Sequence, residues 1–149
     1  MQIRISNTAL DAYHEIQQYQ AAQTHLVGKY GATTVFVGSM REMNQNDAVV
    51  KMQLEHYPGM TEQYLQDIAQ QAIDKWGLLD VLIVHRVGEI NPDDPIVVVA
   101  VWSAHRAAAY EANRFLMEEL KSHAPFWKKE TLANKQTRWV EKNTPGYSS

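Results

Sequence analysis

The segment from Ser103 to Glu130 (SAHRAAAYEANRFLMEELKSHAPFWKKE) holds the residue types and spacing most suited to chemistry on an anion. His105 and Arg106 stand at the start of an expected helix, where free backbone N–H groups and the positive end of the dipole favour an anion. A histidine there can donate to a phosphate or carry a proton near neutral pH. Lys121 and Lys128 follow towards the other end of the segment. The spacing indicates two cationic clusters that bind an anionic substrate.

Each of these residues also has an ordinary structural explanation. Arg106 can be a surface arginine at a strand-to-helix junction, and a cation such as Lys121 is favoured in the last turn of any helix. Lys128 follows Phe126 and Trp127, which are typical core residues. Aromatic neighbours can also partly desolvate a lysine and lower its pKa into the range used in acid–base catalysis.

Helix geometry separates the two clusters. At about 100° per residue, Arg106, Met117 and Lys121 fall on one stripe within about 60°, and the opposite stripe is apolar. Arg106 and Lys121 are nonetheless about 22 Å apart along the axis, too far for one small anion to touch both. Either they serve different purposes, or a two-fold dimer brings the helix start of one chain to the helix end of another. The residues expected in the core on the opposite stripe are Ala108, Ala112, Phe115 and Leu116.

The elements that position these residues follow from hydrophobic periodicity and from capping and turn signals. Three helices are expected, over residues 8–22 with Leu10, Tyr13 and Ile16 inward, from Thr61 to about 76, and from Ser103 to about 123. Seven strands are expected, over residues 2–6, 31–39, 48–57, 79–87, 96–102, 126–130 and 137–140. The Ile96–Trp102 run is nearly all apolar and predicts a strand covered on both faces. We expect an α+β fold in one domain over residues 1–149, with a mixed sheet, about three helices and a loose tail over 142–149.

Composition narrows the function classes. A net charge of −3 gives no basic field for nucleic acid, and no apolar run is long enough to span a bilayer. The N-terminus does not resemble a secretory signal, so we expect a cytoplasmic protein. The chain has no cysteine, and its six histidines lack metal-ligand spacing, so we expect neither a metal nor a cofactor. If the protein handles sulfur, another molecule must bring the sulfur.

Seven runs, in order across residues 31–141 and about three-quarters of the chain, resemble the large, catalytic subunit of molybdopterin synthase. Two of them, LEHYPGMTE and the HR…K…APFWK set, are specific to that family. The runs are VFVGSMR (35–41), LEHYPGMTE (54–62), IVHRVGEI (83–90), VWSAHR (101–106), FLMEELK (115–121), APFWKKE (124–130) and RWVE (138–141).

The resemblance implies a hammerhead-like α/β fold and a sulfurtransferase of molybdenum cofactor biosynthesis. That family adds two sulfurs to cyclic pyranopterin monophosphate, and each arrives as a thiocarboxylate on the C-terminal Gly-Gly of a small ubiquitin-like partner. A central homodimer of the large subunit carries one partner at each end, making a heterotetramer. The family's two catalytic lysines map onto Lys121 and Lys128. One of them would help with acid–base transfer and the other would stabilise the thioester intermediate, but the resemblance does not say which lysine has which role. Its substrate-binding positions map onto Arg41, His105, Arg106, Phe36, Met117 and Lys142.

Two positions depart from the family pattern. Asn46 stands where the family often has glycine, and asparagine tolerates a left-handed backbone. Lys142 stands where the family has an arginine, so the charge is kept and the bidentate fork is lost. Two other functions stay open from the residues alone: a scaffold that docks a ubiquitin-like tail without chemistry, and a phosphate-ester hydrolase that lacks an obvious nucleophile or metal.

Overall fold

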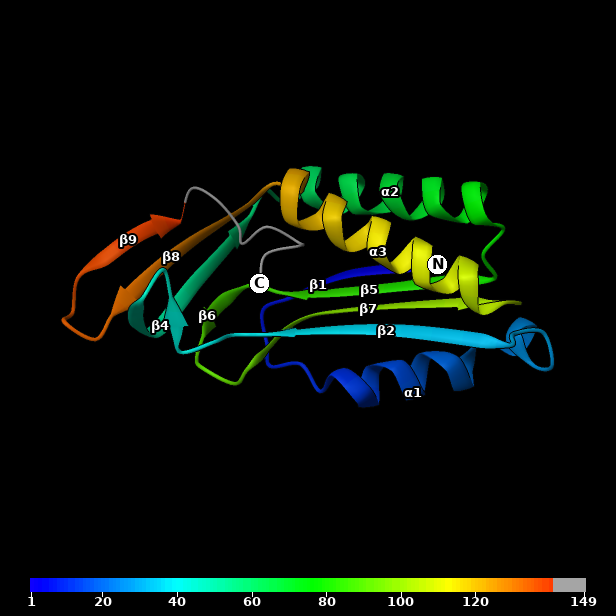
Figure 1. Ribbon diagram of the computed structural model, residues 1–149, viewed down its shortest axis with the longest axis horizontal. Helices are drawn as coiled ribbons and strands as arrows, with labels where there is room; N and C mark the ends of the chain where they lie inside the picture. Colours follow the sequence, from blue (N-terminus) through cyan, green and yellow to red (C-terminus); the bar gives the residue numbers. More distant parts are fainter. Residues whose placement is uncertain (141–149) are drawn as a thin grey trace.

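A long mixed sheet forms the centre of the computed structural model, which describes residues 1–140. Its strand order is β1-β5-β7-β2, with β1 parallel to β5 and the other neighbours antiparallel. Helices α2 and α3 cover one face and α1 the other (Figure 1). The strands are β1 (Gln2–Ser6), β2 (Ala32–Ser39), β5 (Asp80–Arg86) and β7 (Pro95–Ser103); the helices are α1 (Ala12–Ala22), α2 (Met60–Trp76) and α3 (Arg106–His123).

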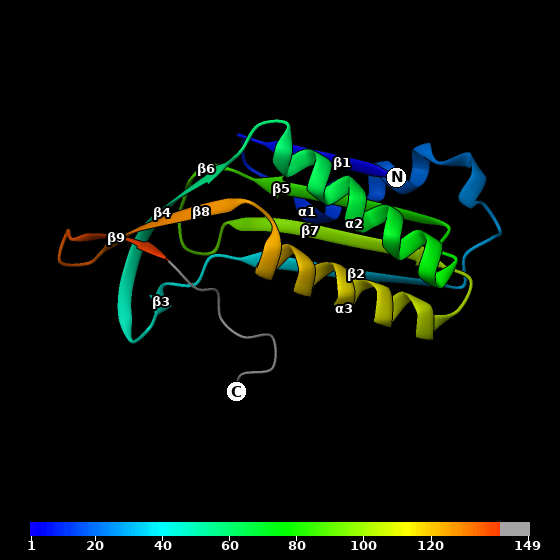
Figure 2. The same ribbon diagram turned by 90° about the horizontal axis from the view of Figure 1, so that it is seen from above.

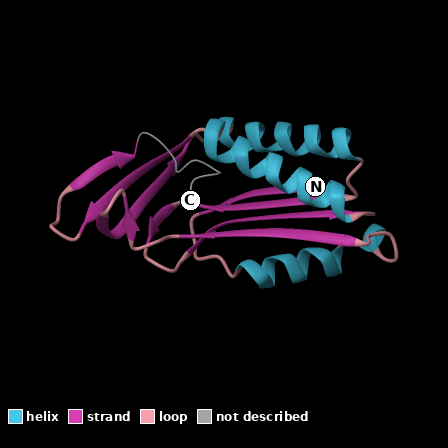
Figure 3. Cartoon of the chain, viewed as in Figure 1, coloured by secondary structure: helices cyan, strands magenta, loops and turns pink. Residues whose placement is uncertain are grey.

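A second, antiparallel sheet extends from one end of the first (Figures 1 and 3). Strand β4 lies at its centre and pairs with three other strands. The top view shows β4, β8 and β9 beyond the C-terminal end of α3 (Figure 2). The elements are β3 (Met43–Asn44), β4 (Asp47–His56), β6 (Gly88–Ile90), β8 (Phe126–Leu132) and β9 (Thr137–Val140), and a short 3₁₀ turn, Thr24–Leu26, follows α1.

The central strands are buried on both faces, as the Ile96–Trp102 run predicts. Alternate side chains of β5 and β7 point to opposite faces because successive residues of a strand do so. Val81 and Val99 pack under α2 and α3, whereas Leu82 and Val98 pack under α1. A third cluster of buried residues, including Met52 and Leu54, lies beneath the second sheet. The α+β architecture with a mixed sheet and three helices is confirmed.

The three helices begin at residues other than the predicted starts at Thr8, Thr61 and Ser103. Helix α1 begins after Asp11, whose carboxylate accepts from the His14 N–H at 3.3 Å, and α2 begins after Gly59. Thr61 lies inside α2, where its hydroxyl accepts from the Tyr57 N–H and donates to the Pro125 carbonyl, both at 2.9 Å. Ser103 ends β7, and the residue before α3 is His105.

In the segment predicted as the first helix, the buried face follows the prediction at Leu10 and Ile16 and departs from it at Tyr13. Tyr13 is 74% exposed, whereas Ala12 and Tyr19 are buried. The Tyr19 hydroxyl donates to Asp80 at 2.8 Å, and this carboxylate lies 61 residues away in the sequence. A local hydrophobic pattern cannot reveal such a partner.

In the expected strand over residues 48–57, Val50, Met52 and Leu54 should form the buried face and alternate with Val49, Lys51 and Gln53, and this pattern is half right. Met52 and Leu54 are buried as expected, but Val49 is buried and Val50 is 49% exposed. The pairing of β4 with β8 shifts register between Val49 and Lys51, which is a β-bulge. A bulge inserts one residue and reverses the faces on one side of it.

Candidate active site

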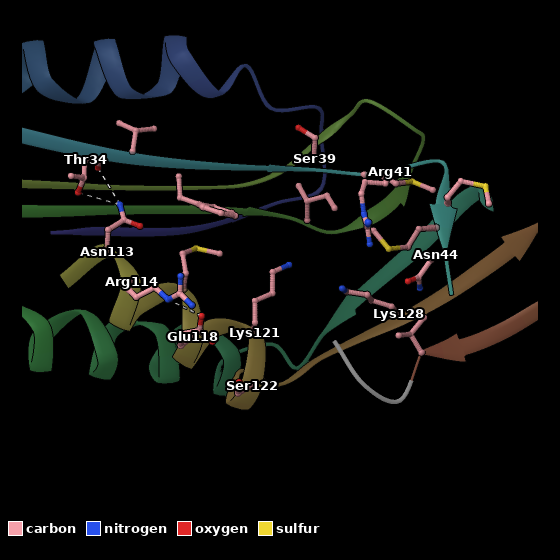
Figure 4. Close-up of a pocket in the computed structure, with 18 of the residues that line it drawn as sticks. Thr34, Ser39, Arg41, Asn44, Asn113, Arg114, Glu118, Lys121, Ser122 and Lys128 are labelled. Atoms are coloured by element: carbon pink, nitrogen blue, oxygen red, sulfur yellow. Dashed lines mark hydrogen bonds and ion pairs between the residues drawn. The ribbon is translucent and has the colours of Figure 1, made fainter. Parts of the chain in front are cut away.

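A cavity of about 1110 Å³ lies between α3, β2 and the second sheet. Five of the residues named from the sequence line it: Phe36, Arg41, Met117, Lys121 and Lys128. The amino groups of Lys121 and Lys128 and the guanidinium of Arg41 point towards one another from three different elements (Figure 4). The structure therefore gathers cations that are up to 87 residues apart in the sequence.

The turn after α3 brings the two lysines together. Helix α3 ends at His123, and the Thr61 hydroxyl holds the Pro125 carbonyl at 2.9 Å. Phe126 then stacks on the buried His85 ring, with centroids 4.0 Å apart and 19° between the planes. Because alternate residues of a strand share a face, Lys128 lies on the same side of β8 as Phe126.

Lys121 lies in the last turn of α3 and is partly buried. Burial, and secondly the positive charge of Lys128, lower the pKa of Lys121 from 10.5 to about 8. A lysine with such a pKa exchanges a proton readily near neutral pH. The last-turn position explains why a cation is tolerated there, but it does not explain this pKa, which comes from the cavity.

Lys128 pairs with Leu54 of β4 and with Val140 of β9, so its backbone is held between two strands. Burial lowers the pKa of its amino group; Glu130 opposes this shift and Arg41 adds to it. The core-packing alternative holds for Phe126, which packs in the core, but not for Trp127, which is 44% exposed.

Glu130 is a site residue that the sequence analysis missed. It is 5% exposed and lines the cavity. Its carboxylate accepts from Asn44 Nδ2 at 2.9 Å and from Arg138 Nε at 3.0 Å. Arg138 also donates to the Asn44 carbonyl and to Asp47. The carboxylate thus holds the hairpin after Arg41 against β8. In the sequence, Glu130 follows Lys128 by two residues, and this spacing could have indicated that both side chains lie on the same face of the strand.

We expect Glu130→Gln to lower the free energy of unfolding by about 1–2 kcal/mol, because it weakens two partly buried hydrogen bonds to a carboxylate. Urea denaturation measures this loss. Asp47→Asn is the matched control, since it removes the exposed partner of the same arginine and exposed pairs contribute less than about 1 kcal/mol. Equal losses in the two variants would contradict the central role of Glu130.

The hairpin between β3 and β4 depends on left-handed backbone. Gln45 and Asn46 have φ of 52° and 64°. Two consecutive positive φ values are what a tight type I′ hairpin requires. The prediction that Asn46 supports a left-handed turn is confirmed.

His105 and Arg106 do not join this cavity. Both are exposed at the start of α3, and the cavity is lined by α3 only from Tyr110 onwards. A single chain therefore does not unite the two cationic clusters, as the helix length predicts. Lys142, the third predicted basic substrate residue, lies outside the described residues.

The remaining histidines form no metal site within residues 1–140. His56 lies 3.6 Å from Glu62, and His85 Nδ1 donates to the Arg86 carbonyl at 2.8 Å. Burial lowers the pKa of His85 to about 3, so its imidazole is neutral. In the part of the chain that is described, no helix has the length and apolar character needed to cross a bilayer.

Comparison with known proteins identifies the family. Residues 7–123 match the model of the MoaE protein family. The chain belongs to this family. A molybdopterin synthase catalytic subunit from Ralstonia nicotianae is 45% identical over 139 residues, which are 93% of this chain and 76% of the relative. That of Haemophilus ducreyi is 49% identical over 128 residues, 86% of this chain and 82% of the relative.

A solved MoaE structure has the same fold. The molybdopterin biosynthesis MoaE protein from Burkholderia ambifaria superposes with a TM-score of 0.78 at 43% identity, over 97% of this chain and 92% of that one. The resemblance found in the sequence motifs is thereby confirmed.

Proposed function

We propose that this MoaE-family protein is the catalytic subunit of a molybdopterin synthase. It inserts two sulfurs into cyclic pyranopterin monophosphate, and each sulfur comes from the C-terminal thiocarboxylate of a small ubiquitin-like partner. The observation that carries the proposal is the convergence of Lys121, Lys128 and Arg41 in one cavity, with both lysine pKa values lowered. The names of the close relatives support it, and a cytoplasmic location belongs to the same proposal.

The chemistry divides into two steps at each carbon. The thiocarboxylate sulfur attacks a substrate carbon and displaces the oxygen substituent of that carbon, which leaves as water or as a phosphate-ester oxygen. The product of this step is a thioester between that sulfur and the acyl carbon of the partner's terminal glycine. Water then cleaves the thioester, so the sulfur stays on the substrate and the partner leaves with an ordinary carboxylate. The protein itself needs no thiol, and the chain has no cysteine.

The lysines serve these steps in two ways. An amino group that titrates near neutral pH can give or take a proton as the sulfur attacks and as water adds. A second ammonium stabilises the negative oxygen that develops when water adds to the thioester. The pKa of about 8 suits Lys121 to the proton-transfer role, and we propose that Lys128 is the electrostatic partner, with Arg41 holding the substrate's anionic group.

One assay separates this proposal from its two rivals. The protein is supplied with the cyclic pterin phosphate, with and without the thiocarboxylated partner, and dithiolene product is measured. Product that requires the thiocarboxylate supports the synthase. Docking of the partner without product would favour a scaffold, and phosphate release without the partner would favour a hydrolase.

We further propose that His105 and Arg106 complete the cavity of a second copy in a two-fold dimer, since in one chain they lie outside it. Two dimer-related cavities, each with one partner molecule, would give a heterotetramer. This rests on the helix length: about 22 Å separates Arg106 from Lys121.

Mixing chains tests the shared site. Arg106→Ala and Lys121→Ala proteins, each nearly inactive alone, are expected to recover activity when mixed and re-equilibrated, because one cavity in each mixed dimer has both wild-type residues. At random pairing, half the dimers are mixed and each has one intact cavity, so activity should approach about a quarter of the wild-type value. Sedimentation confirms that dimers exchange. No recovery in exchanged dimers would place both residues in the same chain's site.

A further inference from the structure

The cavity has two chemically different ends. Lys121, Lys128 and Arg41 make the cationic end, whereas the other end is lined by Thr34, Tyr110 and Asn113, beside the ion pair of Arg114 and Glu118. Asn113 precedes Lys121 by eight residues on α3, so their Cα atoms are about 12 Å apart along the helix. The proposed roles of Lys121, Lys128 and Arg41 all lie at the cationic end, and none of them involves Asn113.

The side chain of Asn113 is fixed in one orientation. It is 8% exposed, and its Nδ2 donates to the Thr34 carbonyl and to the Val99 carbonyl, each at 3.1 Å. Both partners are acceptors, so only the amide nitrogen can face them and the alternative flip is excluded. Figure 4 shows the nitrogen turned to Thr34 and the oxygen turned away from it.

The amide oxygen has no donor of its own in the described part of the chain. No group within residues 1–140 donates a hydrogen bond to Asn113 Oδ1. This oxygen is not among the fully enclosed side-chain atoms without a partner, so it touches open space, and the space beside Asn113 is the cavity. An acceptor held rigidly at a cavity wall is ready for an N–H donor of a bound molecule.

We infer that Asn113 Oδ1 accepts a hydrogen bond from the amino-pyrimidinone edge of the pterin substrate, whose exocyclic amino group and ring N–H are donors. The inference rests on the proposed function for the substrate class. A neutral ring edge with N–H donors needs an acceptor, which Asn113 Oδ1 supplies, and Arg114 at this end is paired with Glu118 at 3.0 Å. The anionic group of the same substrate lies with the cations at the other end. An extended peptide is the less suitable occupant, because Asn113 already takes the Thr34 carbonyl that a strand added to β2 would use.

The test measures binding rather than turnover. Dissociation constants of the cyclic pterin phosphate and of inorganic phosphate are determined for the assembled wild-type protein and for Asn113→Ala. We expect Asn113→Ala to bind the pterin phosphate about tenfold more weakly and inorganic phosphate as the wild type does. Gln70→Ala is the control: it removes an exposed side-chain amide from another helix, α2, where Gln70 donates to Asp74 at 2.9 Å outside the cavity, so both affinities should be unchanged.

Several outcomes would overturn the inference. Unchanged pterin affinity in Asn113→Ala would do so, and so would equal weakening of phosphate, which indicates general distortion of the cavity. A change in oligomeric state would show that a second copy, not the substrate, meets this oxygen. If Asn113→Ala does not fold, Asn113→Ser decides by the same criteria, since its hydroxyl keeps a small donor but is too short to replace the amide oxygen.

Failure here is distinguishable from failure of the proposed function. Wild-type protein that binds the pterin phosphate with the Asn113 dependence described, yet forms no product with the thiocarboxylated partner, supports the binding role and contradicts the synthase reaction. Wild-type protein that does not bind the pterin phosphate contradicts both.

Discussion

Replacing Lys121 by alanine is expected to lower the rate of sulfur transfer by about 10²–10⁴-fold and to leave the fold and partner binding intact. The reason is the pKa of about 8, which lets this amino group both hold and release a proton at the pH of the reaction. Steady-state product formation measures the rate, and titration with the partner measures docking. Lys75→Ala is the matched control, because Lys75 also lies in the last turn of a helix but stacks on Trp76, outside the cavity.

The same pKa predicts a pH dependence. In the wild type, the single-turnover rate should change between about pH 7 and pH 9 with a midpoint near 8, and this limb should be absent from the residual rate of Lys121→Ala. Wild-type-like turnover in the variant, or an unchanged limb, would remove Lys121 from proton transfer.

Lys121 should also cost the protein stability. Its folded pKa lies below the unfolded value of 10.5, so folding favours the neutral amine and the ammonium opposes folding. The cost is fully present below about pH 8 and disappears as the pH rises towards 10.5. Lys121→Met is therefore expected to raise the free energy of unfolding at pH 7 by about 1–2 kcal/mol while it abolishes activity. Urea denaturation at pH 7 and pH 10 should show this gain shrinking at the higher pH.

The order of elements could be predicted because periodicity is a local property. The buried strands and the long helix that ends at Pro125 are visible as apolar runs, turn signals and a helix breaker. The helix starts could not be predicted in the same way. A hydroxyl such as that of Thr61 can either cap a helix or donate a hydrogen bond to a distant carbonyl, and only the tertiary structure decides between the two. The bulge at Val50 was not predicted for a similar reason. In the sequence, apolar and polar residues of this strand alternate regularly, and the shift in register is visible only in its pairing with β8.

The candidate site, too, could be predicted only where local sequence features mark its residues. Lys121 and Lys128 were found because the family motifs mark them, and their lowered pKa values come from burial that the sequence only suggests through Phe126 and Trp127. Glu130 and Asn113 were missed. A glutamate in a strand and an asparagine in a helix are usually solvent-exposed, and what makes these two important is a set of partners far away in the sequence. The dimer arrangement was reached from helix length and from the family resemblance, and it stays a prediction.

Replacing Lys128 by glutamine should abolish most activity, as in Lys121→Ala, and should also raise the pKa of Lys121. The positive charge of Lys128 is the second cause of the lowered Lys121 pKa, after burial. Glutamine removes that charge and keeps a polar side chain only one atom shorter. Burial is then the remaining cause, so the pKa of Lys121 should move above 8 without reaching 10.5.

The pKa of the Lys121 amine in this variant is measured directly, by NMR titration of its side-chain carbon. Lys129→Gln is the matched control: Lys129 is the next residue of β8, faces away from the cavity and lies over the Trp139 ring, 5.7 Å from its centroid. It should change neither the rate nor the titration. An unshifted Lys121 in Lys128→Gln would mean that the two amines do not sense each other across the cavity, and a paired role for them in sulfur transfer would then be untenable.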